Sequence, residues 1–339
     1  MIRGTILGTG SYLPKFRLTN AELEKLVDTS DEWIATRTGI RVRHISGPGE
    51  ETSKIAAQAA RQALAMAGIS PEELSQIIVG TITPEMTMPS CACLVQKEIG
   101  AVNGYAFDLS AACSGFLYAL DIADKQVRAN PDSKILVIGA ETLSSRVNWQ
   151  DRNTCVLFGD GAGAAVVGSA RGERGILAGK LFSDGRLWDL LHMNAAPSQN
   201  PFLGGEDGGG VDPSRLGTPR KDSGSYIRMV GREVFKNAVR AMEDAVAQVL
   251  REAGVSASDI DLVVPHQANI RILQSLGERL GISQEKIYIN IHKYGNTSAA
   301  TIPIALDDAN REGMLHRGDM VLLCAFGGGF TWGAELIRW

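Results

Sequence analysis

Three residues could carry out acyl chemistry, although they lie far apart in the chain. Cys113 lies among small residues, His266 follows an apolar stretch that ends in proline, and Asn296 follows a glycine in a short turn. A cysteine supplies a nucleophile, a histidine supplies a base or a hydrogen-bond donor, and an asparagine supplies a neutral donor. Each also has an ordinary structural interpretation, because a lone histidine after a strand or an asparagine before a helix is common.

The surroundings of Cys113 predict a turn between a strand and a buried helix. Residues 105–109 alternate as a short strand does, and residues 116–123 are apolar on nearly every side, which is typical of a buried helix. Free N–H groups and the helix dipole favour an anion at the start of a helix. We therefore expect the pKa of the Cys113 thiol to be lowered, which would make it a better nucleophile. The alternative is that Cys113 is only a small buried hydrophobic residue.

The chain repeats itself at an offset of 186 residues. Residues 67–70 resemble residues 253–256, residues 119–121 match residues 305–307, and the apolar strand 135–138 matches 321–324. The repeat predicts two copies of one α/β unit, in residues 1–172 and 173–339, which form two sheets between layers of helices in the order α-β-α-β-α. At this offset Cys113 corresponds to Ala299, which suggests that the two copies contribute different residues to one shared site.

Composition excludes several classes of protein. The chain has 339 residues and a net charge of −4, too weak a charge to indicate nucleic-acid binding. It has no apolar run long enough to span a membrane, and we expect no signal peptide, because residues 1–8 lack its long apolar core and cleavage site. Five cysteines are few and odd in number, so we expect reduced thiols and a cytoplasmic protein. The Cys91-Ala92-Cys93 pair lacks a second pair at zinc spacing, so we expect no metal.

Two glycine-rich stretches, residues 8–10 and 159–163, do not match a dinucleotide-binding fingerprint. Neither has the Gly-x-Gly-x-x-Gly spacing with an acidic partner further on, and position 13 is Leu13. We interpret both stretches as structural turns.

Several long motifs together resemble a known family. DLSAACSGFLYAL, VVPHQANIRI, HKYGNTSAA and AFGGGFTWG occur in this order, and DTSDEWIATRTG and FGDGAG precede the second of them. They are similar to β-ketoacyl-[acyl carrier protein] synthase III, a condensing enzyme of the thiolase superfamily. The resemblance implies a duplicated thiolase-like fold and a homodimer. It also implies that Cys113 is acylated by a short acyl-coenzyme A, which is a substrate and not a cofactor, and that malonyl-acyl carrier protein then loses carbon dioxide and condenses with the acyl group.

The resemblance also assigns roles to individual residues. His266 and Asn296 would stabilise the enolate, and the backbone N–H groups of Cys113 and Gly328 would form the oxyanion hole. Residues expected to contact coenzyme A are Thr29, Trp33, Arg37, Arg152, Gly231 and Asn269, with Trp33 and Arg152 on the two sides of the adenine. Residues expected to line the acyl pocket are Met88, Leu143, Leu191 and Phe326, with Met88 contributed across the dimer. Residues expected to bind the carrier protein are Arg232, Lys236, Arg240 and Arg271.

Some alternatives remain open from sequence alone. Arg232, Lys236 and Arg240 recur every four residues, which also fits an ordinary solvated helix face. The segment 194–225 is longer than the corresponding family segment and could form a lid, a partner surface or a tolerated insertion.

Two other functions also remain open. Besides the enzyme that initiates fatty acid synthesis, a starter enzyme of a secondary-metabolite pathway with another acyl primer fits the same motifs. A Cys-His-Asn hydrolase fits them less well, because the duplicated scaffold argues against it.

Overall fold

Two sheets form the framework of the protein. The computed structural model describes residues 2–194 and 225–339. The first sheet has the order β1 (Ile2–Tyr12), β7 (Asp160–Arg171), β6 (Ile135–Thr142), β4 (Gln76–Gly80) and β5 (Tyr105–Leu109). The second has the order β11 (Leu262–Pro265), β12 (Met320–Gly327), β13 (Thr331–Arg338) and β8 (Gly175–Ser183). Both sheets combine parallel and antiparallel pairs. The parallel pairs are β4 with β5 and β6 in the first sheet and β11 with β12 in the second.

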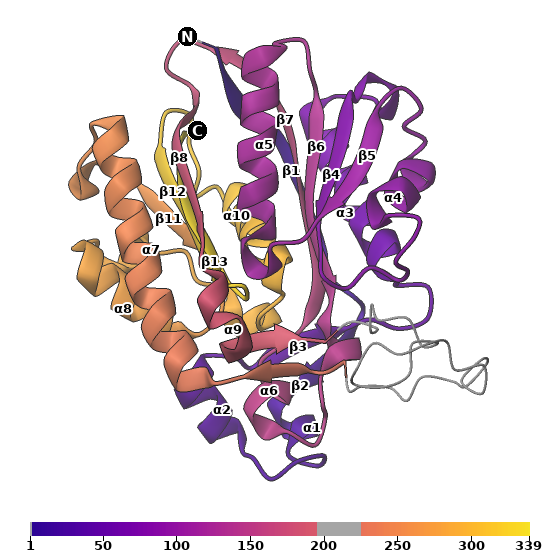
Figure 1. Ribbon diagram of the computed structural model, residues 1–339, viewed down its shortest axis with the longest axis vertical. Coiled ribbons are helices and arrows are strands. Elements are labelled where there is room, and N and C mark those ends of the chain that lie inside the picture. Colours follow the sequence, from indigo (N-terminus) through magenta and orange to yellow (C-terminus); the bar gives the residue numbers. More distant parts are fainter. Residues whose placement is uncertain (1, 195–224) are drawn as a thin grey trace, which may run out of the picture.

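Helices lie between the sheets and on both outer faces (Figure 1). The central layer consists of α5 (Gly115–Ala129) and α10 (Thr301–Arg311), whose apolar residues share one core with both sheets. The first sheet is covered on its other face by α3 (Thr52–Ala67) and α4 (Cys91–Ile99), and the second by α7 (Gly231–Ala253) and α8 (Ile270–Leu280). These five layers confirm the predicted α/β fold in the order α-β-α-β-α.

The predicted repeat has a structural counterpart at the same offset. The 3₁₀ turn Ala112–Ser114, which leads into α5, corresponds to the 3₁₀ turn Ser298–Ala300, which leads into α10. Ala112 and Ser298 have φ values of +44° and +50°, and no other described non-glycine residue has a positive φ. Non-glycine residues adopt this region at a cost in energy, so the two turns share an unusual backbone and not only a position.

Close backbone contacts hold these two turns against the first sheet. A Cβ atom on Gly139 in β6 would lie 2.1 Å from the carbonyl oxygen of Ala299, and one on Gly80 would lie 2.8 Å from the carbonyl carbon of Gly115. Only glycine fits at such distances. The ends of β4 and β6 therefore fix the positions of both central helices at the end where the site lies.

Smaller elements close this end of the molecule (Figure 1). They comprise the paired strands β2 (Phe16–Thr19) and β3 (Val42–Ile45), the paired strands β9 (Leu191–Met193) and β10 (Ile227–Met229), and the short helices α1 (Asn20–Leu23), α2 (Asp31–Thr38), α6 (Arg152–Cys155) and α9 (Ile291–Tyr294). Buried Arg43 ties them together, because its guanidinium donates to Asn20 Oδ1 at 2.8 Å and to the carbonyl of Val156 at 2.7 Å. No helix in the described part of the chain has the length and apolar character needed to cross a membrane.

Candidate active site

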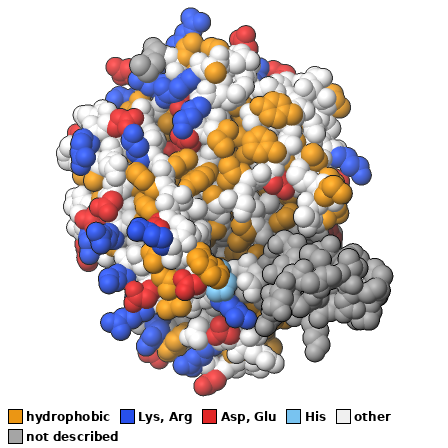
Figure 2. All heavy atoms as spheres, in the orientation of Figure 1, with side chains coloured by type: hydrophobic (Ala, Val, Ile, Leu, Met, Phe, Trp, Pro, Cys, Tyr) orange, Lys and Arg blue, Asp and Glu red, His pale blue; other side chains and the backbone are white. Residues whose placement is uncertain are grey.

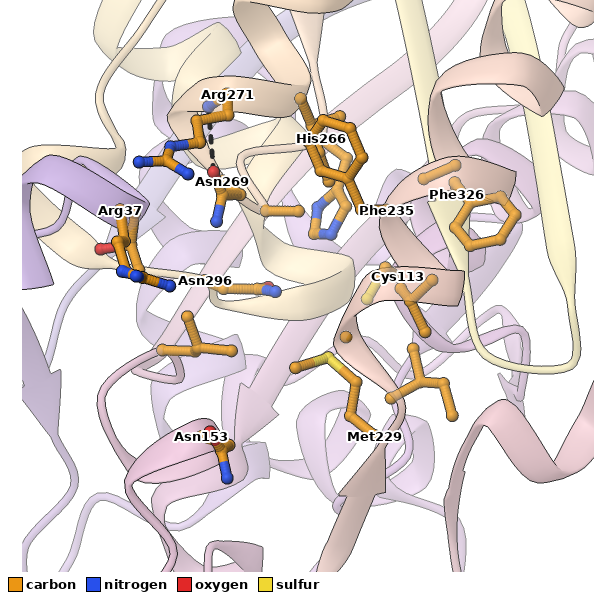
Figure 3. Close-up of a pocket in the computed structure, with 18 of the residues that line it drawn as sticks. Arg37, Cys113, Asn153, Met229, Phe235, His266, Asn269, Arg271, Asn296 and Phe326 are labelled. Carbon is orange, nitrogen blue, oxygen red and sulfur yellow. Dashed lines mark hydrogen bonds between the residues drawn. The ribbon is translucent and has the colours of Figure 1, made fainter.

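Cys113, His266 and Asn296 meet at one cavity. The cavity has a volume of about 670 Å³, and all three residues line it. Figure 3 shows their side chains pointing toward a common centre from three different segments of the chain. Its wall also contains four of the residues that the resemblance assigns to coenzyme A, namely Trp33, Arg37, Gly231 and Asn269.

Cys113 lies in the 3₁₀ turn directly before α5, as the sequence predicts. The expected low thiol pKa is wrong, because burial raises the pKa of Cys113 to about 12. An interaction with the Ser298 hydroxyl acts in the opposite direction, and the negative charge of Glu141 adds to the effect of burial. The cost of removing a thiolate from water thus exceeds the favourable field at the helix start, and the proton of Cys113 needs an acceptor.

The hydrogen bonds of His266 define which of its nitrogens carries a proton. Its Nδ1 lies 2.6 Å from Thr301 Oγ1, and that hydroxyl donates to the carbonyl of Ser298 at 2.9 Å. A hydroxyl has one proton to donate, so Nδ1–H must donate to Thr301 and Nε2 carries a lone pair. Burial lowers the pKa of His266 to about 3, so the ring is neutral at neutral pH. His266 therefore becomes a donor toward the cavity only after Nε2 takes up a proton.

Asn296 is oriented as a hydrogen-bond donor. Its Oδ1 accepts from the backbone N–H of Ser298 at 2.8 Å, which leaves Nδ2 free to donate. Its backbone is fixed on both sides, because its N–H donates to Leu157 and its carbonyl accepts from Gly159 at 3.0 Å. The side chain points toward the same centre as Cys113 (Figure 3).

A second cavity lies on the other side of Cys113. It has a volume of about 570 Å³ and is mostly apolar, with walls that include Leu143, Leu191, Phe158, Ile227 and Trp188. Cys113 lines both cavities, whereas His266 and Asn296 line only the first. Cys113 therefore stands at the junction between them.

Two expected acyl-pocket residues lie elsewhere than in this second cavity. Phe326 lines the first cavity, on the side of His266. Met88 lines neither cavity of this chain and is 85% exposed. A place for Met88 in an acyl pocket therefore depends on a second copy of the chain, as the resemblance implies.

Gly328 lies close to Cys113, as an oxyanion hole requires. It lines the second cavity with Cys113, in the turn between β12 and β13. A Cβ atom at Gly328 would lie 2.9 Å from the carbonyl of Leu191, and one at the preceding Gly327 would lie 2.7 Å from the backbone nitrogen of Cys113. These glycines let the turn between β12 and β13 approach the backbone of Cys113 and of Leu191 closely.

At the mouth of the first cavity, the indole of Trp33 is in contact with two guanidinium groups. Those of Arg37 and Arg152 lie 5.1 and 5.0 Å from the ring centre. Such distances are those of direct cation–π contacts, so no flat ring fits between Trp33 and Arg152 in this state. Arg152 does not line the cavity and donates to the carbonyl of Asp28 at 2.7 Å. The Thr29 hydroxyl nearby is buried without a hydrogen-bond partner among the described residues.

The four expected carrier-binding residues fall into two groups. Arg232 and Arg271 line the first cavity. Lys236 and Arg240 continue along the exposed face of α7, away from the cavity. Within the described residues, no ion pair is found for any of the four. The expectations for residues 194–225 fall, apart from the two end residues, outside the described residues.

Sequence reasoning missed three polar residues that organise this site, Ser298, Thr301 and Glu141. Ser298 belongs to the motif around Asn296, where only the asparagine stood out, and Thr301 directly follows that motif. Glu141 lies near the end of β6, after six residues without polar side chains, and is completely buried. A charged residue at the end of a buried strand was the available signal for it.

Comparisons with known proteins agree over the full chain. Family models described as 3-oxoacyl-[acyl-carrier-protein] synthase III and its C-terminal part match residues 107–185 and 250–339. The β-ketoacyl-[acyl-carrier-protein] synthase III of Desulfotalea psychrophila is 58% identical over 334 residues, 98% of this chain and 99% of that protein. The crystal structure of 3-oxoacyl-[acyl-carrier-protein] synthase III from Aquifex aeolicus has a TM-score of 0.89 at 51% identity and covers 99% of this chain and 100% of that one. The priming β-ketosynthase of the R1128 polyketide pathway has a TM-score of 0.88 at 35% identity, with 98% and 96% covered.

Proposed function

The chain belongs to the β-ketoacyl-[acyl carrier protein] synthase III family, and from this premise we propose that it condenses a short acyl-coenzyme A, with acetyl-coenzyme A as the preferred one, with malonyl-acyl carrier protein to initiate fatty acid synthesis. One observation carries the proposal: Cys113 borders two cavities, and His266 and Asn296 border only one of them. An acyl group on Cys113 can extend into the apolar cavity while a malonyl group arrives beside His266 and Asn296.

In the first half-reaction the thiol of Cys113 attacks the thioester carbon of the acyl-coenzyme A, and free coenzyme A leaves. The backbone N–H groups of Cys113 and Gly328 stabilise the oxyanion that forms in the tetrahedral intermediate. Trp33, Arg37 and Arg152 hold the nucleotide end of the substrate, with Thr29, Gly231 and Asn269 along the path. Because Trp33 and Arg152 touch in this state, substrate binding must separate them before adenine can lie between them.

In the second half-reaction the malonyl group loses carbon dioxide, and the resulting carbanion attacks the acyl thioester. The developing enolate oxygen needs hydrogen-bond donors and no nearby negative charge. Asn296 Nδ2 supplies one donor, because Oδ1 accepts from the backbone N–H of Ser298. His266 supplies the other after its Nε2 takes up a proton from solvent, so decarboxylation and the protonation of His266 are coupled.

Each half of the repeat contributes to the proposed site. Cys113 belongs to residues 1–172, and His266 and Asn296 belong to residues 173–339.

We further propose a homodimer formed along the free edge of β5. Exposed apolar residues lie at this edge and on the neighbouring segments, namely Met86, Met88, Val102 and Tyr105. Figure 2 shows hydrophobic side chains over the region of β4, β5 and α4. The second cavity reaches β5 at Asp108, so Met88 of a second copy can close it.

The alternative, a starter enzyme for a secondary-metabolite pathway, has weaker support. The polyketide priming enzyme shares 35% identity, against 58% for the fatty acid relative. Incubation with a panel of acyl-coenzyme A primers and malonyl-acyl carrier protein, followed by product mass spectrometry, tests the choice. Acetoacetyl-acyl carrier protein as the main product supports the proposal. Selective use of a long or aromatic primer supports the alternative, and free acid without condensation indicates a hydrolase.

The remaining expectations belong to the proposal. The five cysteines, all described and all free, fit a cytoplasmic enzyme with reduced thiols. The proposed reaction needs no cofactor. The two bonds that break, the C–S bond of the acyl thioester and the C–C bond to the malonyl carboxylate, both belong to the substrates. Arg232, Lys236, Arg240 and Arg271 are proposed to bind the acidic carrier protein.

A further inference from the structure

Glu141 is a buried carboxyl group to which the reaction described so far gives no task. It is the next-to-last residue of β6 and has no exposed surface. The Thr83 hydroxyl donates to it at 2.6 Å, the Thr81 hydroxyl at 3.3 Å, the backbone N–H of Ile82 at 3.2 Å and the Ser298 hydroxyl at 3.2 Å. All of these donors are neutral, so a fully buried acid is held in place without a cationic hydrogen-bond partner.

Ser298 connects Glu141 to the reactive residues. Its hydroxyl donates to Glu141. Ser298 lines the second cavity together with Cys113, and the two 3₁₀ turns that hold these residues pack against each other. The backbone N–H of Ser298 orients Asn296, and its carbonyl accepts from Thr301, which holds His266. Ser298 has a φ value of +50°. In this conformation its hydroxyl, its N–H and its carbonyl contact three different residues. A strained backbone at the centre of a site is typical of a residue with a functional role.

The Cys113 proton needs an acceptor other than His266. Burial raises the pKa of Cys113 and lowers that of His266 to about 3, so transfer from the thiol to the imidazole is unfavourable at both ends. Burial raises the pKa of Glu141 to about 7, which makes it a much stronger base than His266. The carboxylate also raises the pKa of Cys113 through its charge. The thiol of Cys113 and the carboxyl group of Glu141 do not both ionise readily, because each negative charge opposes the other. The pair therefore favours one negative charge and one shared proton.

We propose that Glu141 accepts the proton of Cys113 through the hydroxyl of Ser298. This rests on the proposed role of Cys113 as the acylated residue. The thiol proton moves to Ser298 Oγ as the hydroxyl proton of Ser298 moves to Glu141. The sulfur then forms its bond to the acyl carbon, and coenzyme A leaves as a thiolate that is protonated by solvent. In the condensation the carbanion displaces the sulfur of Cys113 from the acyl carbon, and the proton returns from Glu141 by the reverse path.

The other titratable groups around Glu141 do not offer a competing route. Cys91, at the start of α4, is influenced by the charges of Glu141, Glu85 and Asp108, and burial together with these charges raises its pKa far above the ordinary value. Cys91 therefore stays protonated and keeps its proton. Glu85 and Asp108 themselves contact other groups, Ser53 and the first N–H groups of α4.

The relay is tested by the pH dependence of Cys113 alkylation with iodoacetamide, followed by peptide mass spectrometry between pH 5 and 9. In the unmodified protein the rate rises through a midpoint near pH 7 and then levels off, as Glu141 loses its proton. Glu141→Gln and Ser298→Ala each slow the reaction at pH 7 by about 100-fold, within the usual range for general-base catalysis. In both variants the rate rises about tenfold per pH unit up to pH 9 without a plateau, because hydroxide must then remove the proton.

Two further variants separate a relay from simple packing. Thr83→Val removes the 2.6 Å hydrogen bond to Glu141 but leaves Ser298 in place, so the plateau persists and its midpoint moves to higher pH. The double variant of Glu141→Gln and Ser298→Ala is no slower than the slower single variant, because both interrupt one path. Thermal melting of each variant checks folding, and Ser298→Ala carries the test if Glu141→Gln does not fold.

The relay is overturned if Glu141→Gln or Ser298→Ala lowers the rate but retains the midpoint near pH 7. It is also overturned if Thr83→Val leaves the midpoint unchanged. Acetylation by acetyl-coenzyme A is measured in parallel. Alkylation with the predicted pH profile but without acetylation of Cys113 contradicts the proposed function and leaves the relay standing.

Discussion

His266 Nδ1 lies 2.6 Å from Thr301 Oγ1, in a buried contact that fixes the tautomer of the ring. The contact leaves Nε2 as an acceptor toward Cys113 and the cavity. Thr301 is therefore a positioning residue, which acts on the reaction only through His266.

Replacing Thr301 by valine tests this role. Thr301→Val removes the acceptor of Nδ1–H, and loss of one buried hydrogen bond of about 1 kcal/mol corresponds to a roughly five- to tenfold slower reaction. We expect the loss in kcat for malonyl decarboxylation, with the KM for acetyl-coenzyme A unchanged. Thr301→Ser keeps the hydroxyl and should decarboxylate at nearly the parent rate. His266→Ala should lose more activity than Thr301→Val, because it removes the imidazole itself. Equal losses in Thr301→Val and Thr301→Ser would show that the hydroxyl is not what matters.

The exposed strip on α7 predicts a specific loss of carrier binding. Lys236 and Arg240 lie outside the first cavity, so reversing both to glutamate raises the KM for malonyl-acyl carrier protein and leaves the use of acetyl-coenzyme A unchanged. The effect shrinks with added salt, because exposed charges are screened over about 8 Å at physiological ionic strength. The same double reversal at exposed Lys97 and Arg317 changes the net charge equally. An equal rise of KM in both double variants would indicate a general charge effect without a docking strip.

In the proposed dimer, Met88 of one copy closes the acyl pocket of the other, and we expect it to move aside for longer acyl groups. Methionine is flexible, so we expect acetyl to be the best primer and four-carbon primers to be used measurably. Met88→Phe lowers kcat/KM for butyryl- and hexanoyl-coenzyme A more than for acetyl-coenzyme A, by about 1–3 kcal/mol for each lost methylene site. Leu143→Phe is the matched variant, because Leu143 lines the second cavity of its own chain. Discrimination by Leu143→Phe but not by Met88→Phe would exclude Met88 from the partner's pocket.

Glu335 predicts a pH-dependent stability. It is completely buried on β13 without a hydrogen-bond partner among the described residues, and burial together with Asp121 and Asp124 raises its pKa well above the ordinary value. The folded protein then binds this proton more tightly than the unfolded chain, so the free energy of unfolding falls as pH rises from the unfolded pKa, about 4.3, to the folded one. Glu335→Gln removes the effect and gains stability relative to the parent as pH rises.

Thermal melting at pH 5.5, 7 and 8.5 measures the difference in stability. We expect the melting temperature of Glu335→Gln to exceed that of the parent most at pH 8.5. Asp132→Asn, at an exposed carboxyl group, should follow the parent at all three values. A parallel shift of Glu335→Gln at every pH would mean that Glu335 is not titrating.

The sequence was sufficient to predict the architecture and the meeting of Cys113, His266 and Asn296. The architecture rests on local patterns, since a strand, a turn and a buried helix follow one another around Cys113 and recur at the same offset in the second half. The meeting of the three residues rests also on the resemblance of the motifs around them to a known family. The thiol pKa was predicted in the wrong direction, because the depth of burial depends on the packing of both halves. Glu141 and Ser298 are 157 positions apart, so their contact exists only in the folded chain.

The most direct test of the central claim is to locate the acyl group after reaction with acetyl-coenzyme A. Intact-mass measurement followed by peptide mapping should find a single acetyl group on Cys113 and none on the other cysteines. Cys113→Ala should remain unlabelled, and Cys113→Ser serves as a second check with a poorer nucleophile. An acetyl group on Cys91, Cys93, Cys155 or Cys324 in place of Cys113 would contradict the account.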